Sequence, residues 1–263
     1  MSIDRQPAVA GAFYPANPVV LGRRVDDLLA GVADSGALPH PKALIAPHAG
    51  YQYSGPIAAS AYARLAPIAA RIRRVVLLGP AHRLPFRGIA FTGADRLLTP
   101  LGAVDLDREA LAGLADLPQV QRLDAAFDGE HCLEVQLPFL QRVLGDFRVV
   151  PLIVGAVEPE AVAEVIDRLW GGDETLIVIS SDLSHYHDYA TATRLDRETT
   201  RVIEQLEPAA LDHQAACGAT PLAGLLVAAR RRAMQVRTLD LRNSGDTAGP
   251  RDQVVGYGAY AVF

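Results

Sequence analysis

The stretch LIVISSDLSH, residues 176–185, combines two features that decide how this chain folds. Its first four residues are apolar without alternation, which is typical of a strand buried on both faces of a sheet. Small polar residues follow at once, and the stretch ends in a histidine. In α/β proteins, polar segments of this kind follow the buried strands of a largely parallel sheet, at the edge where ligands bind.

The same pattern recurs elsewhere along the chain. Three more apolar runs end abruptly in Gly, Pro or a polar residue: ALIA at 43–46, VVLL at 75–78 and VVPLIV at 149–154. We also predict later strands at 237–241 and 254–263. The last of these alternates in polarity, which suits antiparallel pairing.

Helical segments separate the predicted strands, at 17–33, 55–66, 161–170 and 220–232. Asn17-Pro18, Glu158-Pro159 and Thr220-Pro221 each place a proline at a helix start, and Pro67 is expected to stop the second helix. No Ser/Gly/Pro-rich linker divides the chain. We therefore predict one three-layer α/β/α domain over residues 1–263, with a mostly parallel central sheet.

Composition excludes several classes of function. The 263 residues carry a net charge of −5, which argues against a nucleic-acid partner, because phosphate binding needs a clustered basic face. No apolar run approaches the roughly 20 residues that span a bilayer, and the N-terminus lacks the pattern of a signal peptide. Two cysteines are too few for a disulfide framework. We expect a cytoplasmic protein with neither a membrane nor a nucleic-acid partner.

Histidines follow three of the predicted strands. His48 comes just after the run at 43–46, His82 after the run at 75–78, and His185 after the run at 176–179. Because ligands of open α/β sheets bind beyond the carboxyl ends of the strands, these imidazoles predict a metal or acid/base site there. Three further histidines lack this context and are predicted to lie on the surface: His40, His187 and His213.

Two further segments carry candidate functional groups. In EHCLE, residues 130–134, a helix starting at 128–129 would place His131 in its first turn and on one face with Glu134. That pair suits a metal or a proton relay, or simply a solvated first turn. Cys217 precedes a predicted helix start, where the helix dipole favours a thiolate, although a buried packing role is the alternative. Cys132 is predicted to be a packing residue.

Five short blocks, in this order, resemble the Memo family: APHAGY at 46–51, LGPAH at 78–82, EHCLE at 130–134, SSDLSH at 180–185 and CG at 217–218. Prokaryotic members of that family are labelled component B of the AmmeMemoRadiSam system. The family is similar in fold to class III extradiol ring-cleavage dioxygenases, which hold Fe(II) with two His and one Glu. The resemblance therefore implies an extradiol-dioxygenase-like fold for the whole chain.

The resemblance also implies residue roles. His48 and His82 match the two imidazole ligands, and Cys217 lies where the family places a thiol instead of the dioxygenase carboxylate. His131 and His185 match histidines that face substrate or oxygen in the dioxygenases and are implied as catalytic. Asp182, three residues before His185, is counted with them as the partner that would orient an imidazole.

A thiol in place of a carboxylate changes the expected chemistry. It favours softer metals and is itself oxidisable. We expect one transition-metal ion, iron or copper with zinc as the alternative, in a redox enzyme whose small organic substrate enters past Tyr51 and Tyr53. Two other functions stay open: an adaptor that keeps the pocket, as described for phosphotyrosine-binding eukaryotic members, and a zinc-dependent hydrolase. The family label further implies association with a radical-SAM protein and a third component.

Overall fold

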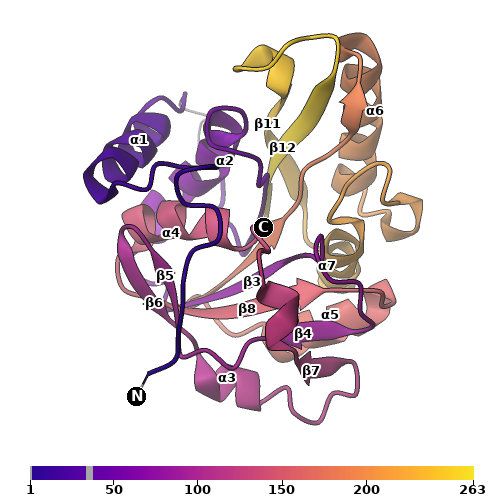
Figure 1. The fold of residues 1–263 in the computed structure, drawn as a ribbon. Coiled ribbons are helices and arrows are strands. Elements are labelled where there is room, and N and C mark those ends of the chain that lie inside the picture. The colour runs from indigo at the N-terminus through magenta and orange to yellow at the C-terminus, as the bar shows by residue number, and fades with distance from the viewer. Residues whose placement is uncertain (1, 34–37) are drawn as a thin grey trace.

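The computed structural model describes residues 2–33 and 38–263, and a mixed sheet is its largest element (Figure 1). The strands run in the order β10-β12-β2-β9-β3-β8-β4-β7, and β11 also pairs with β12. Their bounds are β2 Ala43–Ala46, β3 Arg74–Pro80, β4 Ile89–Phe91, β7 Val120–Arg122, β8 Arg148–Val154, β9 Thr175–Ser180, β10 His185–His187, β11 Val236–Asn243 and β12 Val254–Val262.

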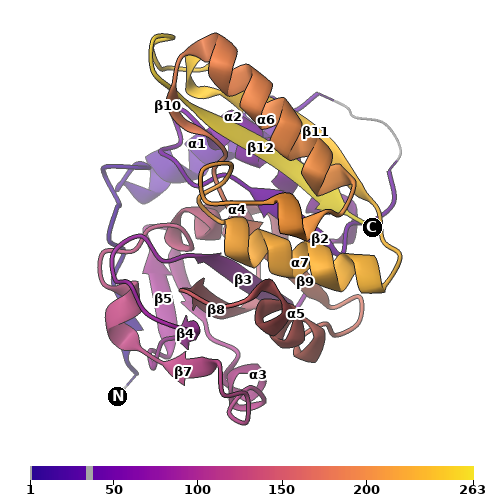
Figure 2. The same cartoon turned by 90° about the vertical axis from the view of Figure 1, so that its right-hand side faces the viewer.

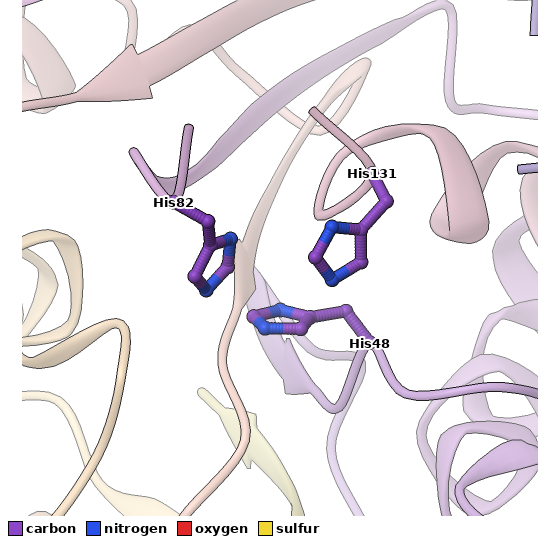
Figure 3. A group of neighbouring side chains, drawn as sticks. All are labelled: His48, His82 and His131. Carbon is purple, nitrogen blue, oxygen red and sulfur yellow. The ribbon is translucent and has the colours of Figure 1, made fainter. Parts of the chain in front are cut away.

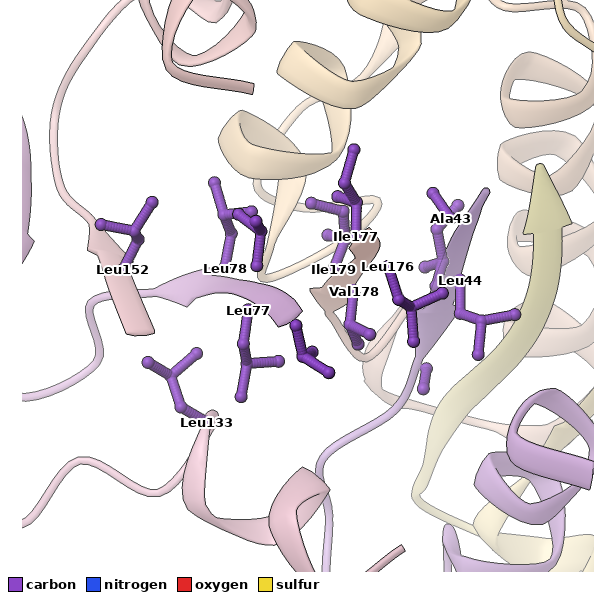
Figure 4. Packing of buried hydrophobic residues seen from close by; sticks show 14 of the residues in the cluster. Ala43, Leu44, Leu77, Leu78, Leu133, Leu152, Leu176, Ile177, Val178 and Ile179 are labelled. Carbon is purple, nitrogen blue, oxygen red and sulfur yellow. The ribbon is translucent and has the colours of Figure 1, made fainter. Parts of the chain in front are cut away.

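The centre of the sheet is parallel. Strands β2, β9, β3 and β8 pair in parallel, and Val76 of β3 faces Ile177 of β9 on one side and Val150 of β8 on the other. Leu77 and Leu78 lie on opposite faces of β3, and both are fully buried (Figure 4). Burial on both faces explains why these strands are continuously apolar. The four predicted strands and the α/β class are confirmed.

Strand β12 joins the sheet in the opposite sense to the central strands. Strand β12 is antiparallel to β2, β10 and β11. The two later strands predicted at 237–241 and 254–263 correspond to β11 and β12, and the antiparallel pairing of β12 is confirmed. The short strands β4, β7 and β10 were not predicted, because three residues carry too little pattern to identify a strand.

Helices cover both faces of the sheet. Figures 1 and 2 show α1, α2 and α4 on one face and α5, α6 and α7 on the other. The α-helices are α1 Pro18–Ala30, α2 Gly55–Tyr62, α3 Arg108–Ala112, α4 Leu137–Leu144, α5 Pro159–Arg168, α6 Tyr189–Glu204 and α7 Ala219–Arg231. The 3₁₀ helices are η1 Ala63–Ile68, η2 Asp124–Phe127, η3 Glu134–Gln136, η4 Pro208–Ala210 and η5 Ser244–Asp246.

Helix starts follow the predicted chemistry in two cases out of three. The Asn17 side chain accepts hydrogen bonds from the amides of Val19 and Val20, and α5 begins with Pro159. Helix α7, however, begins one residue before Thr220, and Gly218 is its N-cap. Pro67 also does not stop the second helix. It lies inside η1, which continues α2 as a tighter 3₁₀ turn.

A small second sheet holds the N-terminal segment. It consists of β1 Asp4–Arg5, β5 Arg96–Thr99 and β6 Gly102–Asp105, in the order β1-β5-β6. The guanidinium of Arg96 pairs with the carboxylate of Asp4 across this sheet. This sheet was not predicted either, since its strands are short and partly exposed. Among the described residues, no helix is both long enough and apolar enough to cross a bilayer.

Candidate metal centre

Three histidines from three separate segments meet beyond the carboxyl ends of the parallel strands. His48 follows β2, His82 follows β3, and His131 comes from the segment between η2 and η3. Their rings turn toward one another (Figure 3), with centroids 4.9 to 5.5 Å apart. One ligand nitrogen from each ring lies within 4.8 Å of the other two. We call these three residues the histidine cluster.

His48 is the most deeply buried member of the cluster. Its side chain is 2% exposed, and its Nδ1 lies 2.9 Å from the hydroxyl of Ser180 at the end of β9. Burial, with the neighbouring charge of His82, lowers the pKa of His48 to about 3. The imidazole is therefore neutral at pH 7, which is the form that binds metals.

His82 is held by a carboxylate. Its Nδ1 lies 2.9 Å from Oε1 of Glu130, and its backbone amide donates to Oε2 of the same residue at 2.7 Å. The Glu130 carboxylate also accepts from the amides of His131 and Cys132. Burial opposes the charge of Glu130, but its hydrogen bonds with His82 outweigh burial and lower its pKa to about 2. Glu130 is thus an ionised carboxylate that orients one imidazole.

His131 precedes a turn and the 3₁₀ helix η3, and the α-helix predicted to start at 128–129 is absent. The helix α4 begins only at Leu137, where Pro138 occupies its first turn. Glu134 turns away from His131 and accepts hydrogen bonds from the amides of Ala8 and Val9. The predicted His131–Glu134 pair is therefore not formed.

The electrostatic setting of His131 resembles that of His48. Burial and the nearby His48 lower the pKa of His131 to about 4, so its ring is neutral at pH 7. Its Nδ1 is buried and has no hydrogen-bond partner among the described residues. Phe13 packs against the ring with centroids 4.8 Å apart. The Nδ1 nitrogen of His131 lies 3.4 Å from Oε1 of Glu130, and the ring is neutral, which is the form that can bind a metal.

Cys217 lies beside the histidine cluster. Its Sγ is 3.2 Å from Nε2 of His48 and accepts a hydrogen bond from the amide of Asp182 at 3.3 Å. Burial and the carboxylate of Asp182 raise the pKa of the thiol to about 12. The predicted thiolate at the start of α7 therefore does not form without a cation, because burial outweighs the helix dipole.

Asp182 supports this arrangement through the backbone. Its Oδ1 accepts from the amide of His48 at 2.7 Å, while Oδ2 lies 3.9 Å from Nε2 of the same residue. Its own amide holds Cys217, so one residue positions both neighbours. His185 begins β10 and lines the same cleft.

The cluster opens into a cleft of about 640 Å³. Phe13, Tyr53 and Tyr257 line its walls, together with the cationic side chain of Arg83. Tyr51 does not line it, because its ring is buried against Phe139 and its hydroxyl donates to the carbonyl of Val135. The other three histidines do not line the cleft: His40 and His213 are exposed, and His187 is half-buried.

The donor groups fit a transition-metal ion. Neutral imidazoles and a thiol are ligands that iron, copper and zinc accept, whereas magnesium and calcium prefer oxygen. The approach of the three imidazoles, with ligand nitrogens within 4.8 Å of one another, and the short contact between Cys217 and His48 are the structural observations that agree with a bound cation. A second group within ligating distance consists of His82, Glu130 and Cys132, but Cys132 is fully buried and its Sγ contacts the carbonyl of Pro80. Its packing role is confirmed.

Sequence reasoning missed the residues that hold the histidines. Glu130 was read only as part of the EHCLE block, although a glutamate beside a candidate ligand is a signal for such a role. Ser180 was interpreted only as the first polar residue after a strand and as part of the SSDLSH block. Gln136, which contacts Ser180, carried no signal, because a glutamine in an apolar segment has no distinctive spacing.

The fold and site define a class: an α/β protein whose parallel strands lead into a histidine-rich candidate metal centre. The comparisons with known proteins are more specific. The model of the Memo-like protein family matches residues 5–261, and the chain belongs to that family.

Curated relatives cover almost the whole chain. A MEMO1 family protein of Aquifex aeolicus is 38% identical, over 96% of this chain and 97% of its own length. Another, of Methanopyrus kandleri, is 35% identical over 98% of both chains. The names of these relatives mention no activity. Among solved structures, an uncharacterized protein of Escherichia coli K12 matches with a TM-score of 0.52 and 14% identity, over 83% of this chain and 98% of that one. That likeness concerns the fold alone.

Proposed function

We propose that this chain is a metal-dependent redox enzyme that holds one transition-metal ion through His48, His82 and Cys217. The observation that carries the proposal is the meeting of two imidazoles with a thiol, whose Sγ lies 3.2 Å from Nε2 of His48. A nitrogen and sulfur donor set favours copper or iron over hard cations. When bound, such an ion supplies the electron-transfer or oxygen chemistry that side chains alone lack.

The remaining polar residues have distinct tasks in this proposal. Asp182 positions two ligands at once, because its carboxylate holds the backbone of His48 and its amide holds the sulfur of Cys217. His131 is neutral and buried at the edge of the cleft, so it can accept a proton from a bound substrate at pH 7. His185 lines the cleft as a second proton-exchanging group.

The cleft sets the class of substrate. A volume of about 640 Å³ lies within the range of small-molecule sites. Its walls include the aromatic rings of Phe13, Tyr53 and Tyr257, and Tyr53 is one of the two tyrosines expected at the substrate entrance. We therefore propose a small organic substrate that meets the ion at the bottom of the cleft.

One observation favours a second candidate, a zinc-dependent hydrolase. The three ligand atoms within 4.8 Å of one another belong to the histidine cluster, and Cys217 is not among them. Three imidazoles with an open fourth position are the donor set of many catalytic zinc sites. The two candidates differ in the metal and in the third ligand.

Metal content distinguishes the two candidates. Protein purified without an affinity tag under anaerobic conditions is analysed for iron, copper and zinc, beside His48→Ala, Cys217→Ser, His131→Gln and the exposed control His213→Ala. About one equivalent of iron or copper that is lost in His48→Ala and Cys217→Ser but kept in His213→Ala supports the redox enzyme. Zinc that survives Cys217→Ser but not His131→Gln supports the hydrolase. Full metal in His48→Ala would show that the ligand assignment is wrong.

Activity is then tested on the loaded protein. Oxygen uptake with catechol-like compounds is measured for the wild type and for His185→Gln, which removes a proposed proton-exchanging group. A rate that depends on metal and falls at least about tenfold in the variant supports the role of His185. If the metal-loaded protein shows no redox turnover but hydrolyses esters, the result supports the second candidate instead.

A further inference from the structure

We propose that Gln136 and Ser180 are positioning residues that hold His48 in one tautomer, with the proton on Nδ1 and the lone pair on Nε2. Both side chains are fully buried, and neither lines the cleft. The consequence for metal binding rests on the proposed function. The tautomer itself is a property of the metal-free chain.

The orientation of the Gln136 amide follows from its partners. Its Nε2 lies 3.0 Å from the carbonyl of Pro47 and 2.8 Å from the hydroxyl of Ser180. A carbonyl can only accept, so the nitrogen of the amide must face Pro47. The Oε1 then faces the hydroxyl of Tyr62 at 2.7 Å, which donates to it. Both amide protons of Gln136 are therefore in use, one of them on Ser180.

Ser180 has only one proton to give. Its hydroxyl lies 2.6 Å from the carbonyl of Cys132, which can only accept, so the proton of Ser180 is used there. The same oxygen receives an amide proton from Gln136. What remains on Ser180 is a lone pair, and it faces Nδ1 of His48 at 2.9 Å. Nδ1 must therefore be the donor.

The consequence lies on the other side of the ring. With the proton on Nδ1, the neutral imidazole carries its lone pair on Nε2, which is the nitrogen beside Cys217. The ligand nitrogen of His48 is thus unprotonated before any cation arrives. With Ser180 absent, the proton is free to occupy Nε2, and a cation must displace it before it can bind.

The ring of His82 is oriented by a charged partner, unlike the ring of His48, and the exposure of the two side chains explains the difference. The side chain of His82 is 27% exposed and contacts the carboxylate of Glu130, whereas the side chain of His48 is 2% exposed. A carboxylate hydrogen-bonded to the ring of a fully buried imidazole would favour the imidazolium, which cannot bind a metal. The carboxylate of Asp182 stays 3.9 Å from Nε2 of His48 and accepts from the backbone amide of that residue instead. Neutral partners such as Ser180 and Gln136 set the tautomer without adding charge.

The tautomer can be read in the metal-free protein. Histidine labelled with ¹⁵N is incorporated, and two-bond ¹H–¹⁵N correlation spectra at pH 7.5 distinguish the two tautomers. The His48 signals are assigned by their loss in His48→Gln. We expect the wild type to show the Nδ1–H form. We expect Ser180→Ala to show a substantial Nε2–H population, Ser180→Thr to restore the wild-type form, and Ser184→Ala, a buried serine outside this hydrogen-bond chain, to leave it unchanged.

Metal affinity provides the second readout. Titration against a competing chelator should show a loss of about 10- to 100-fold in Ser180→Ala, with Ser180→Thr and Ser184→Ala near the wild type. A wild-type spectrum with the proton on Nε2 would overturn the proposal without any variant. An unchanged tautomer in Ser180→Ala would overturn it too. If the wild type binds no metal, the proposed function fails, while the spectra still decide the role of Ser180 and Gln136.

Discussion

Glu130→Gln tests how much of the site depends on one buried carboxylate. The two oxygens of Glu130 accept four hydrogen bonds: from Nδ1 and the amide of His82, and from the amides of His131 and Cys132. An amide in its place has one acceptor oxygen, and its NH₂ group faces at least one of these donors. The substitution therefore leaves a buried donor unpaired as well as removing the charge.

The magnitude follows from the pKa of Glu130. It falls from an ordinary value of 4.5 to about 2 in the folded protein, which corresponds to roughly 3 kcal/mol of stabilisation. Because the folded pKa is the lower one, this stabilisation is fully present above pH 4.5 and is lost as the pH falls toward 2. Glu130→Gln should thus lose about 3 kcal/mol at pH 7, and its deficit should narrow below pH 4.5.

Urea denaturation at pH 7, 5 and 3.5 measures the deficit, and chelator competition measures metal affinity. The matched control is Glu134→Gln, because Glu134 also accepts hydrogen bonds from backbone amides but touches no histidine. Both variants should lose stability, and only Glu130→Gln should also lose metal affinity. A Glu130→Gln protein within about 0.5 kcal/mol of the wild type at pH 7 would refute the reasoning, as would equal losses of affinity in both variants.

Three further outcomes are expected. His48 and His131 have folded pKa values of about 3 and about 4 against an ordinary 6.5, so the unfolded chain binds more protons below pH 6.5. The metal-free protein should therefore lose stability as the pH falls from 6.5 toward 3. A melting temperature that is constant from pH 7 to 5 would contradict this. Gly79→Ala would bring a Cβ to 2.6 Å from the sulfur of Cys132, and should cost about 1–3 kcal/mol in urea denaturation, whereas Gly22→Ala, with its nearest atom at 3.8 Å, should cost nothing. Tyr186 is 69% exposed and has a φ of 60°, so Tyr186→Gly should keep or raise the melting temperature, and a clear fall would show that its ring stabilises the fold.

The parts of this molecule that could be predicted are those whose cause is local. A strand buried on both faces must be apolar throughout, so β2, β3, β8 and β9 appear in the sequence as short continuous runs. His48 and His82 could be found because each follows such a strand directly, and parallel strands bring their carboxyl ends to one edge. The pattern and the structure share one physical cause.

The parts that could not be predicted depend on contacts between distant segments. Ser180 is 132 residues from His48, and Glu130 is 48 residues from His82. The helix predicted to start at 128–129, which is absent, also shows that side-chain contacts decide local structure there. The amides of His131 and Cys132 are taken by the carboxylate of Glu130, and the chain passes through a turn and η3 before α4 begins at Leu137.

The third ligand can be identified from the number of protons that the protein releases when the metal binds. In the metal-free protein His48 and His131 are neutral, and burial keeps the thiol of Cys217 protonated. A metal bound through that sulfur must expel its proton, because a coordinated thiol is a thiolate. His131 is already neutral, so a metal that takes its imidazole in place of the sulfur expels no such proton. Calorimetric titration of the metal-free protein in two buffers of different ionisation enthalpy should therefore find about one proton more released per ion from the wild type than from Cys217→Ser if Cys217 is a ligand, and equal release would assign the third position to His131.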